Sequence, residues 1–171
     1  AHGRSPVRVL FVTPECYPLI KTGGLADVTG ALPRALGRLG CDVRVLLPAY
    51  PGVVDQLDAR AHVADLPDLF GGPGELVHGR AATGLEVLAL DAAHLYDRPG
   101  HPYLGPDGRD WPDNHLRFAA LSWVASRIGQ GALGAWRPEV VHGHDWQAGL
   151  APAYLSFAEG ARPRTVFTVH N

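Results

Sequence analysis

The sequence lacks methionine, has only two cysteines and contains no long apolar run. No apolar stretch approaches the about 20 residues that a helix needs to cross a bilayer, so a membrane protein is not expected. Cys16 and Cys41 stand in apolar surroundings without the spacing of metal ligands, which favours small core residues over a disulfide. The missing methionine, and the end of the sequence directly after an apolar segment, predict a piece of a longer chain.

An excess of charge of one sign is also missing. The 15 basic and 17 acidic side chains give a formal net charge of −2 and form no long runs. Nucleic-acid and membrane-surface binding usually need a basic patch, so neither partner is expected. The first residues lack the apolar core of a signal peptide, and a cytoplasmic location is expected. The 171 residues suffice for one domain with a buried core.

Apolar runs and helical periodicities alternate along the chain. Strands are predicted at residues 7–12, 43–47, 86–90, 139–142 and 165–169, and helices at 25–39, 113–128 and 146–157. Pro33 falls inside the first helix and is expected to kink it or to mark a boundary. Residues 51–84 are interpreted as an insertion with a possible hairpin around residues 71–74. The alternation predicts an α/β fold with a doubly wound, mostly parallel, Rossmann-like sheet.

Polar residues of unusual type follow several of these strands. They are Glu15 to Gly24, Tyr103 in a long loop, His144 with Asp145, and His170 with Asn171. In sheets of this class, ligands bind outside the carboxyl ends of the strands, where the connecting loops converge. The polar residues are therefore expected to form one site.

The segment Lys21-Thr22-Gly23-Gly24-Leu25-Ala26-Asp27 places two glycines directly before a predicted helix. Glycine lets the backbone approach an anion closely, the helix N-terminus is partly positive, and Lys21 adds a full charge. A phosphate or diphosphate would fit. The pattern matches neither G-x-G-x-x-G nor a P-loop, so a glycine-rich turn without a ligand is an equal alternative. Asp27 can simply complement the helix dipole.

The segment His142-Gly143-His144-Asp145-Trp146-Gln147 has several interpretations. Two histidines in this spacing can bind zinc, although no third ligand is evident. Asp145 can cap the helix that follows. A neighbouring carboxylate and indole also suit a sugar, since hydroxyls can meet Asp145 and an apolar sugar face can meet Trp146. An indole taken alone is more often a core residue.

His170 and Tyr103 leave two interpretations open. A lone histidine at the end of a strand is usually structural, yet His170 shares the same predicted edge with three other polar groups. Tyr103 lies in a long loop, of the kind that often carries function in a compact domain. No Ser-His-Asp or Cys-His arrangement can be assembled from these residues.

Several of these motifs together resemble bacterial glycogen synthases and plant starch synthases. The resemblance lies in residues 21–27, Leu95-Tyr96-Asp97-Arg98-Pro99-Gly100, His144-Asp145-Trp146-Gln147 followed by Ala148-Gly149-Leu150-Ala151-Pro152, and Phe167-Thr168-Val169-His170-Asn171. It implies a retaining glycosyltransferase of the GT-B type, in which two Rossmann-like domains face a cleft. Residues 1–171 would form the first, the N-terminal catalytic domain, and the C-terminal nucleotide-binding domain would be absent.

The resemblance also implies a reaction and roles for individual residues. Glucose would be transferred from ADP-glucose to the non-reducing end of an α-1,4-glucan, without a metal or other cofactor. The implied catalytic residues are Asp145 and His170, with Asp145 acting in positioning and electrostatic support. The implied donor-binding residues are Lys21, Gly23, Gly24 and Asn171. The implied acceptor-binding residues are Glu15, Asp27, Tyr103 and Trp146.

Two other functions compete with this expectation. The domain could be a noncatalytic module that binds glucan or nucleotide, or a metal-dependent hydrolase that uses His142 and His144. Because the groups thought to stabilise the departing diphosphate belong to the second domain, residues 1–171 alone are expected to be inactive.

Overall fold

The computed structural model describes residues 3–171, which form one seven-stranded sheet. The strands are β1 (Arg8–Val12), β2 (Asp42–Pro48), β3 (Asp58–Leu66), β4 (Gly74–Arg80), β5 (Glu86–Asp91), β6 (Val140–His144) and β7 (Arg164–Thr168). Their order is β3-β4-β5-β2-β1-β6-β7. The five strands from β5 to β7 in this order pair in parallel, and β3 and β4 pair antiparallel. The predicted mostly parallel α/β sheet is confirmed.

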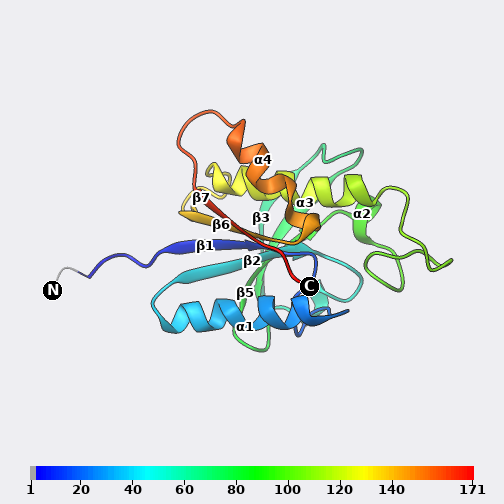
Figure 1. Ribbon diagram of the computed structural model, residues 1–171, viewed down its shortest axis with the longest axis horizontal. Coiled ribbons are helices and arrows are strands. Elements are labelled where there is room, and N and C mark those ends of the chain that lie inside the picture. The colour runs from blue at the N-terminus through cyan, green and yellow to red at the C-terminus, as the bar shows by residue number, and fades with distance from the viewer. Residues whose placement is uncertain (1–2) are drawn as a thin grey trace.

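Helices cover both faces of the parallel strands. The helices are α1 (Gly24–Arg38), α2 (Ala93–Tyr96), α3 (Asn114–Gly129) and α4 (Leu150–Ser156), with short 3-10 turns η1 (Val54–Gln56) and η2 (Trp146–Ala148). Figure 1 shows α1 on one face of the sheet and α3 with α4 on the other. The central strand β1 is therefore covered on both sides, and Leu10, Phe11 and Val12 are fully buried. Within residues 3–171, none of the helices is long and apolar enough to span a bilayer.

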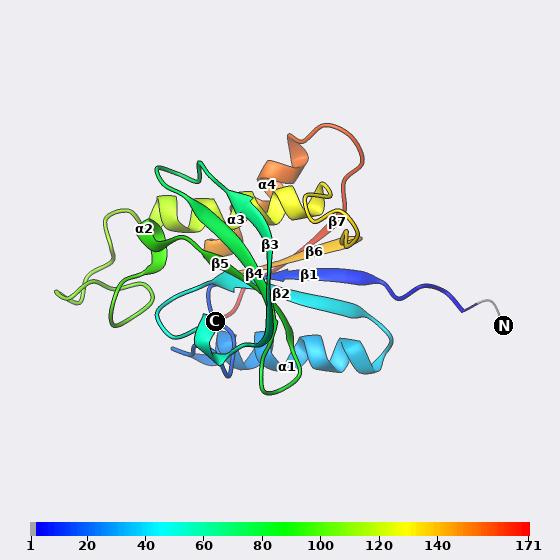
Figure 2. The ribbon, with the colours of Figure 1, turned by 180° about the vertical axis from the view of Figure 1, so that it is seen from behind.

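The sequence-based boundaries differ from the structure in two regions. Residues 51–84, interpreted as an insertion, contain two strands that were not predicted, β3 and β4, whose hairpin extends the sheet beyond β5 (Figure 2). The expected hairpin around residues 71–74 is confirmed. Residues 146–157 were expected to be one helix, but they form η2 and then α4, with Gly149 between the two.

Pro33 lies inside α1 and does not end it, so the expected boundary is wrong. A proline has no N–H to donate to the carbonyl of Thr29, four residues earlier. The thiol of Cys16 donates to this carbonyl instead, at 3.4 Å. Burial raises the pKa of Cys16 to about 12, so the thiol keeps its proton. Both cysteines are free, and the predicted core position of Cys16 is confirmed.

The loop after β1 packs directly on α1 at Gly30. A Cβ on Gly30 would lie 2.5 Å from the carbonyl oxygen of Tyr17, so only glycine allows this approach. The same loop is fixed to the helix by the backbone N–H of Tyr17, which donates to the carbonyl of Ala26 at 3.0 Å. This contact holds the segment between β1 and α1 against the helix.

Replacing Gly30 with alanine should lower the free energy of unfolding by about 1–3 kcal/mol, the usual cost of overpacking. Gly37→Ala is the matched control on the same helix, because a Cβ there meets no described residue within 4 Å. That variant should leave the stability unchanged or raise it by up to about 1 kcal/mol. Urea unfolding of both variants measures the difference, and equal stabilities would contradict the packing described.

Candidate active site

The polar residues expected at one site do gather where the parallel strands end. We call this side the carboxyl edge; it comprises residues 13–24, 97–113, 144–146 and 168–171. Figure 1 shows the chain ending at the same edge of the sheet at which α1 begins. Glu15, Tyr103, Asp145 and His170 are linked to one another or to neighbouring residues by hydrogen bonds. The clustering predicted from strand order is therefore present.

Glu15 joins two loops of the carboxyl edge. Its side chain is buried, and its Oε2 accepts hydrogen bonds from the backbone N–H of Thr22 at 3.1 Å and from the Thr22 hydroxyl at 2.5 Å. The same oxygen accepts a hydrogen bond from the Tyr103 hydroxyl at 3.1 Å. Burial first, and then the negative charge of Glu15, hold the pKa of Tyr103 far above its usual range. Tyr103 therefore remains a hydrogen-bond donor at any physiological pH.

A buried arginine supports the loop that carries Tyr103. The guanidinium of Arg117, on α3, donates to the carbonyl of Pro102 at 2.9 Å and to Oδ1 of Asn114 at 2.8 Å. Asn114 in turn donates to the carbonyl of Tyr103 at 2.9 Å. Neither supporting residue was predicted from the sequence. The available signal was Arg117 itself, a charged residue on the apolar helix α3. Its neighbour in the sequence, Phe118, is also buried.

Lys21 and Asp27 form an ion pair at the surface. The Nζ of Lys21 lies 2.6 Å from Oδ2 of Asp27, and both side chains are about half exposed, at 47% and 54%. Exposed pairs of this kind contribute little to stability. Asp27 thus holds the Lys21 ammonium group beside the first turn of α1, in addition to standing at the positive end of the helix.

Gly23 and Gly24, at the start of α1, make no close contact that requires glycine. A Cβ on Gly23 or Gly24 would meet no described residue within 4 Å. Gly23 has a φ of −157°, an extended conformation that any residue adopts. Among residues 3–171, no side chain caps this end of α1. Gly24 is exposed and Leu25 is partly exposed, whereas Ala26 is fully buried, so a ligand can reach the backbone only at the very start of α1.

Three histidines form a row across β6 and the end of β7. The rings of His142 and His144 stack at 4.1 Å, and Nδ1 of His144 lies 3.0 Å from Nε2 of His170. Burial lowers the pKa of His144 to about 3, with smaller contributions from the neighbouring histidines, and it also lowers the pKa of His142. His144 is therefore neutral at physiological pH. Its contribution to stability is complete above pH 6.5, the pKa of a free histidine, and is lost as the pH falls toward 3.

The geometry of this row does not resemble a zinc site. His142 and His144 stack face to face, and Nε2 of His142 lies 2.7 Å from the Thr168 hydroxyl. Nδ1 of His144 is engaged by His170. The nitrogens of the two rings are thus directed at different partners rather than at a common point.

Asp145 does not cap the helix that follows it, so this alternative is wrong. Its side chain makes no capping hydrogen bond within the described part of the chain. Oδ1 of Asp145 instead accepts a hydrogen bond from the backbone N–H of His170 at 2.7 Å. Asp145 has a φ of 60° and a ψ of −178°, a conformation that costs a residue other than glycine about 1–3 kcal/mol. Strain of this kind is concentrated at functional sites.

Trp146 is exposed rather than part of the core, so the core interpretation is wrong. The side chain is 58% exposed, and its indole contacts the edge of Phe118 at a centroid distance of 5.3 Å. Tyr103 contacts the same phenyl ring at 5.8 Å. Asn171 is also exposed. The carboxyl edge therefore exposes the Trp146 indole beside Asp145.

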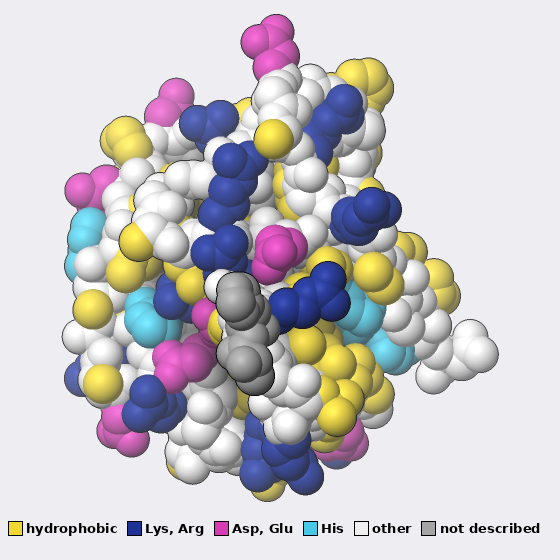
Figure 3. Space-filling model, turned by 90° about the vertical axis from the view of Figure 1, so that its left-hand side faces the viewer, with side chains coloured by type: hydrophobic (Ala, Val, Ile, Leu, Met, Phe, Trp, Pro, Cys, Tyr) yellow, Lys and Arg dark blue, Asp and Glu magenta, His cyan; other side chains and the backbone are white. Residues whose placement is uncertain are grey.

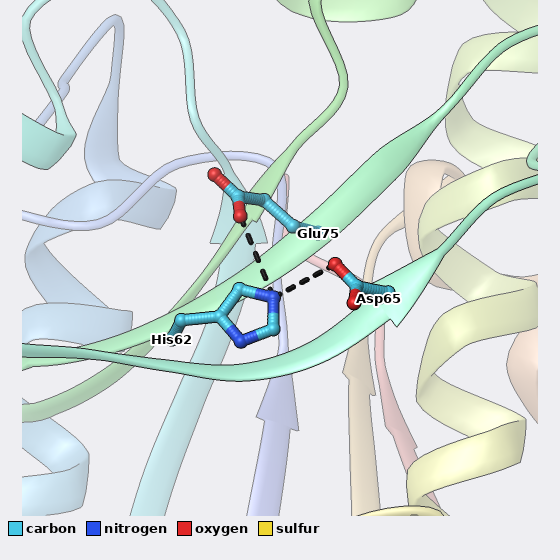
Figure 4. A group of neighbouring side chains, drawn as sticks. All are labelled: His62, Asp65 and Glu75. Carbon is cyan, nitrogen blue, oxygen red and sulfur yellow. Dashed lines mark hydrogen bonds and ion pairs between the residues drawn. The ribbon is translucent and has the colours of Figure 1, made fainter.

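One cluster of possible metal ligands lies elsewhere, on the β3–β4 hairpin. Figure 4 shows His62, Asp65 and Glu75 pointing toward one another. Nε2 of His62 lies 2.9 Å from Oδ1 of Asp65 and 3.6 Å from Oε2 of Glu75. These contacts account for the arrangement without an ion.

Some hollows in the surface lie at the opposite end of the strands, where the strands begin, and others adjoin Asp91, at the end of β5. Figure 3 shows this amino edge, at which arginine side chains gather. Two adjoining hollows share Arg137 and Ala161. Their other arginines are Arg8, Arg127, Arg162 and Arg164. The amino edge is thus a second place where an anion could bind, although none of the expected site residues lies there.

Comparison with known proteins agrees with this arrangement. A family model described as the starch synthase catalytic domain matches residues 8–171. Glycogen synthase 2 of Bradyrhizobium diazoefficiens is 55% identical over 167 residues, which cover 98% of this chain and 34% of the relative. Glycogen synthases of Methylocella silvestris and Cereibacter sphaeroides are 54% and 55% identical, over 98% and 96% of this chain and 34% of each relative. The chain spans about a third of the length of these relatives. The chain belongs to the family of starch synthase catalytic domains.

Proposed function

We propose that this chain is the N-terminal catalytic domain of a glycogen synthase. In the complete protein it would transfer glucose from ADP-glucose to the non-reducing end of an α-1,4-glucan, with retention of configuration. The observation that carries the proposal is the convergence, at the carboxyl edge, of an exposed helix start, a strained aspartate and an exposed indole. The names of the similar proteins support glycogen synthesis, whereas ADP-glucose as donor and retention of configuration come from the family resemblance.

The donor diphosphate would bind at the start of α1. The absence of Cβ atoms at Gly23 and Gly24 leaves room for phosphate oxygens to reach backbone N–H groups, which carry the positive end of the helix dipole. The Lys21 ammonium group would leave Asp27 and bind the diphosphate, because the Lys21–Asp27 ion pair is exposed and weak. Asp27 then acts by holding Lys21 nearby rather than by contacting the glucan.

The transferred glucose would lie beside Asp145 and His170, with Asn171 next to them. The hydrogen bond from the His170 backbone to the Asp145 carboxylate fixes both residues before a substrate arrives. A carboxylate in this place can orient sugar hydroxyls and stabilise positive charge that develops at the anomeric carbon. We assign no covalent nucleophile.

The acceptor glucan would lie along Tyr103 and Trp146. The exposed indole offers a flat apolar surface to a sugar ring, and the Tyr103 hydroxyl is held by Glu15. Glu15 itself is buried, so its contribution is to fix Thr22 and Tyr103 relative to each other. The chain would be one lobe of a GT-B enzyme of the cytoplasm, and the rest of the donor site would come from a second domain.

The proposal is tested by transfer of labelled glucose to glycogen. The full-length protein should extend the glucan from ADP-glucose more efficiently than from UDP-glucose, whereas residues 1–171 alone should show no transfer. If the full-length protein binds glucan or nucleotide but transfers no sugar, a noncatalytic binding module is the correct function.

A further inference from the structure

His144 has no role in the proposed function. The side chain of His144 is fully buried at the end of β6. Its ring lies at 23° to the ring of His170, with a centroid distance of 5.3 Å and a separation of 3.0 Å between Nδ1 and Nε2. Nearly coplanar rings that meet through two nitrogens form an in-plane hydrogen bond, unlike the face-to-face pair of His142 and His144.

His144 forms a side-chain hydrogen bond with His170, through its Nδ1. Its other nitrogen, Nε2, is buried and has no partner within residues 3–171. The groups that face the ring are Phe11, His142 and His170, none of which is acidic. Burial therefore keeps the imidazole neutral, as the lowered pKa also indicates. A polar side chain is costly in such a place, and an apolar one would fill the space without leaving a nitrogen unpaired.

His170 is consequently held at two points. Its backbone N–H donates to Asp145, and its ring is engaged at Nε2 by His144. Whichever of the two rings carries the shared proton, Nδ1 of His170 is left without a partner within residues 3–171. This nitrogen is the part of the ring that remains to meet a ligand.

We propose that His144 is a positioning residue, which orients the His170 imidazole through Nε2 so that Nδ1 contacts the transferred glucose. This inference rests on the proposed function. A fixed ring lowers the cost of orienting the substrate, because the side chain need not be ordered again on binding.

Three variants of the full-length protein test this role. His144→Phe fills the space but cannot bond to His170, so kcat should fall by about 10- to 100-fold with a smaller change in KM. His144→Asn places an amide near the position of Nδ1 and should restore most of the loss. His142→Phe, the control from the same row, should keep kcat within about twofold because His142 bonds to Thr168 rather than to His170. Equal kcat in the His144→Phe and His144→Asn variants would overturn the proposal.

A measurement on the unmodified protein separates this inference from the proposed function and from failures of folding. In protein labelled with ¹⁵N-histidine, NMR should detect a nitrogen–nitrogen coupling between His144 Nδ1 and His170 Nε2, whether or not the protein transfers glucose. Absence of this coupling would overturn the positioning role. Absence of glucose transfer with the coupling present would overturn the proposed function alone.

Discussion

Replacing Lys21 with alanine in the full-length protein should lower kcat/KM for ADP-glucose by about 10- to 100-fold. A hydrogen bond between charged groups is worth about 1.5–3 kcal/mol, and each 1.4 kcal/mol corresponds to about tenfold. The exposed pair with Asp27 costs little to break, so the Lys21 ammonium group is free to move to the diphosphate. Stability should change little, for the same reason. Initial-rate kinetics at varied ADP-glucose concentration measures the effect.

The control for this prediction removes the same charge at the other edge of the sheet. Arg34 is an exposed residue on α1 that lies beside a hollow of the amino edge. Arg34→Ala should therefore keep nearly normal kinetics. Similar losses in the two variants would mean that overall charge, rather than a contact at Lys21, governs donor use. Normal kinetics for Lys21→Ala would remove the assignment of the donor site.

Asp145→Asn should lower kcat by about 10²- to 10³-fold, the usual effect of removing one electrostatic contact to a transition state. Asparagine keeps an oxygen that can accept the hydrogen bond from the His170 backbone. It also tolerates a positive φ better than most residues, so the strained conformation at 60° should persist. The main property lost is the negative charge. Rate measurements at saturating substrates, together with the melting temperature, separate activity from folding.

The control for Asp145→Asn removes the same charge from Asp65, an exposed carboxylate on the β3–β4 hairpin. Asp65→Asn should leave kcat near its original value. If Asp145→Asn also retained most of its kcat, the carboxylate would have only a structural role through His170. A large fall in the melting temperature of the Asp145→Asn variant would mean that its lost activity reflects unfolding.

The parallel core of the fold could be predicted because β1, β2, β5, β6 and β7 are short apolar runs separated by helical periodicities. The turn of the edge hairpin could also be predicted, from the glycines and proline of residues 71–74, but its strand β3 could not. β3 exposes most of its side chains, so residues 58–66 carry no run of apolar residues to indicate a strand. The helix boundary expected at Pro33 was wrong for a different reason. The thiol that bonds to the free carbonyl of Thr29 belongs to a loop outside the helix, so the helix sequence does not show it.

The carboxyl edge could be predicted because strand order alone places residues that follow parallel strands together. Roles within it depended on contacts that sequence does not show. Glu15 is expected from the resemblance to bind the acceptor, and its burial and its bonds to Thr22 and Tyr103 are the basis for the proposal that it fixes these two residues. Asp145 fits the sequence pattern of a helix cap, and only the structure shows that its carboxylate bonds to the backbone of His170 instead.

The central claim is that the donor binds at the carboxyl edge and not at the arginine-lined amino edge. Hydrogen–deuterium exchange of the full-length protein, with and without saturating ADP-glucose, tests it directly because it reports on both edges at once. Protection should appear in peptides that cover residues 21–26 and 168–171, with no change in residues 127–137 and 160–164. Protection confined to the latter two segments, with the carboxyl edge unchanged, would contradict the account.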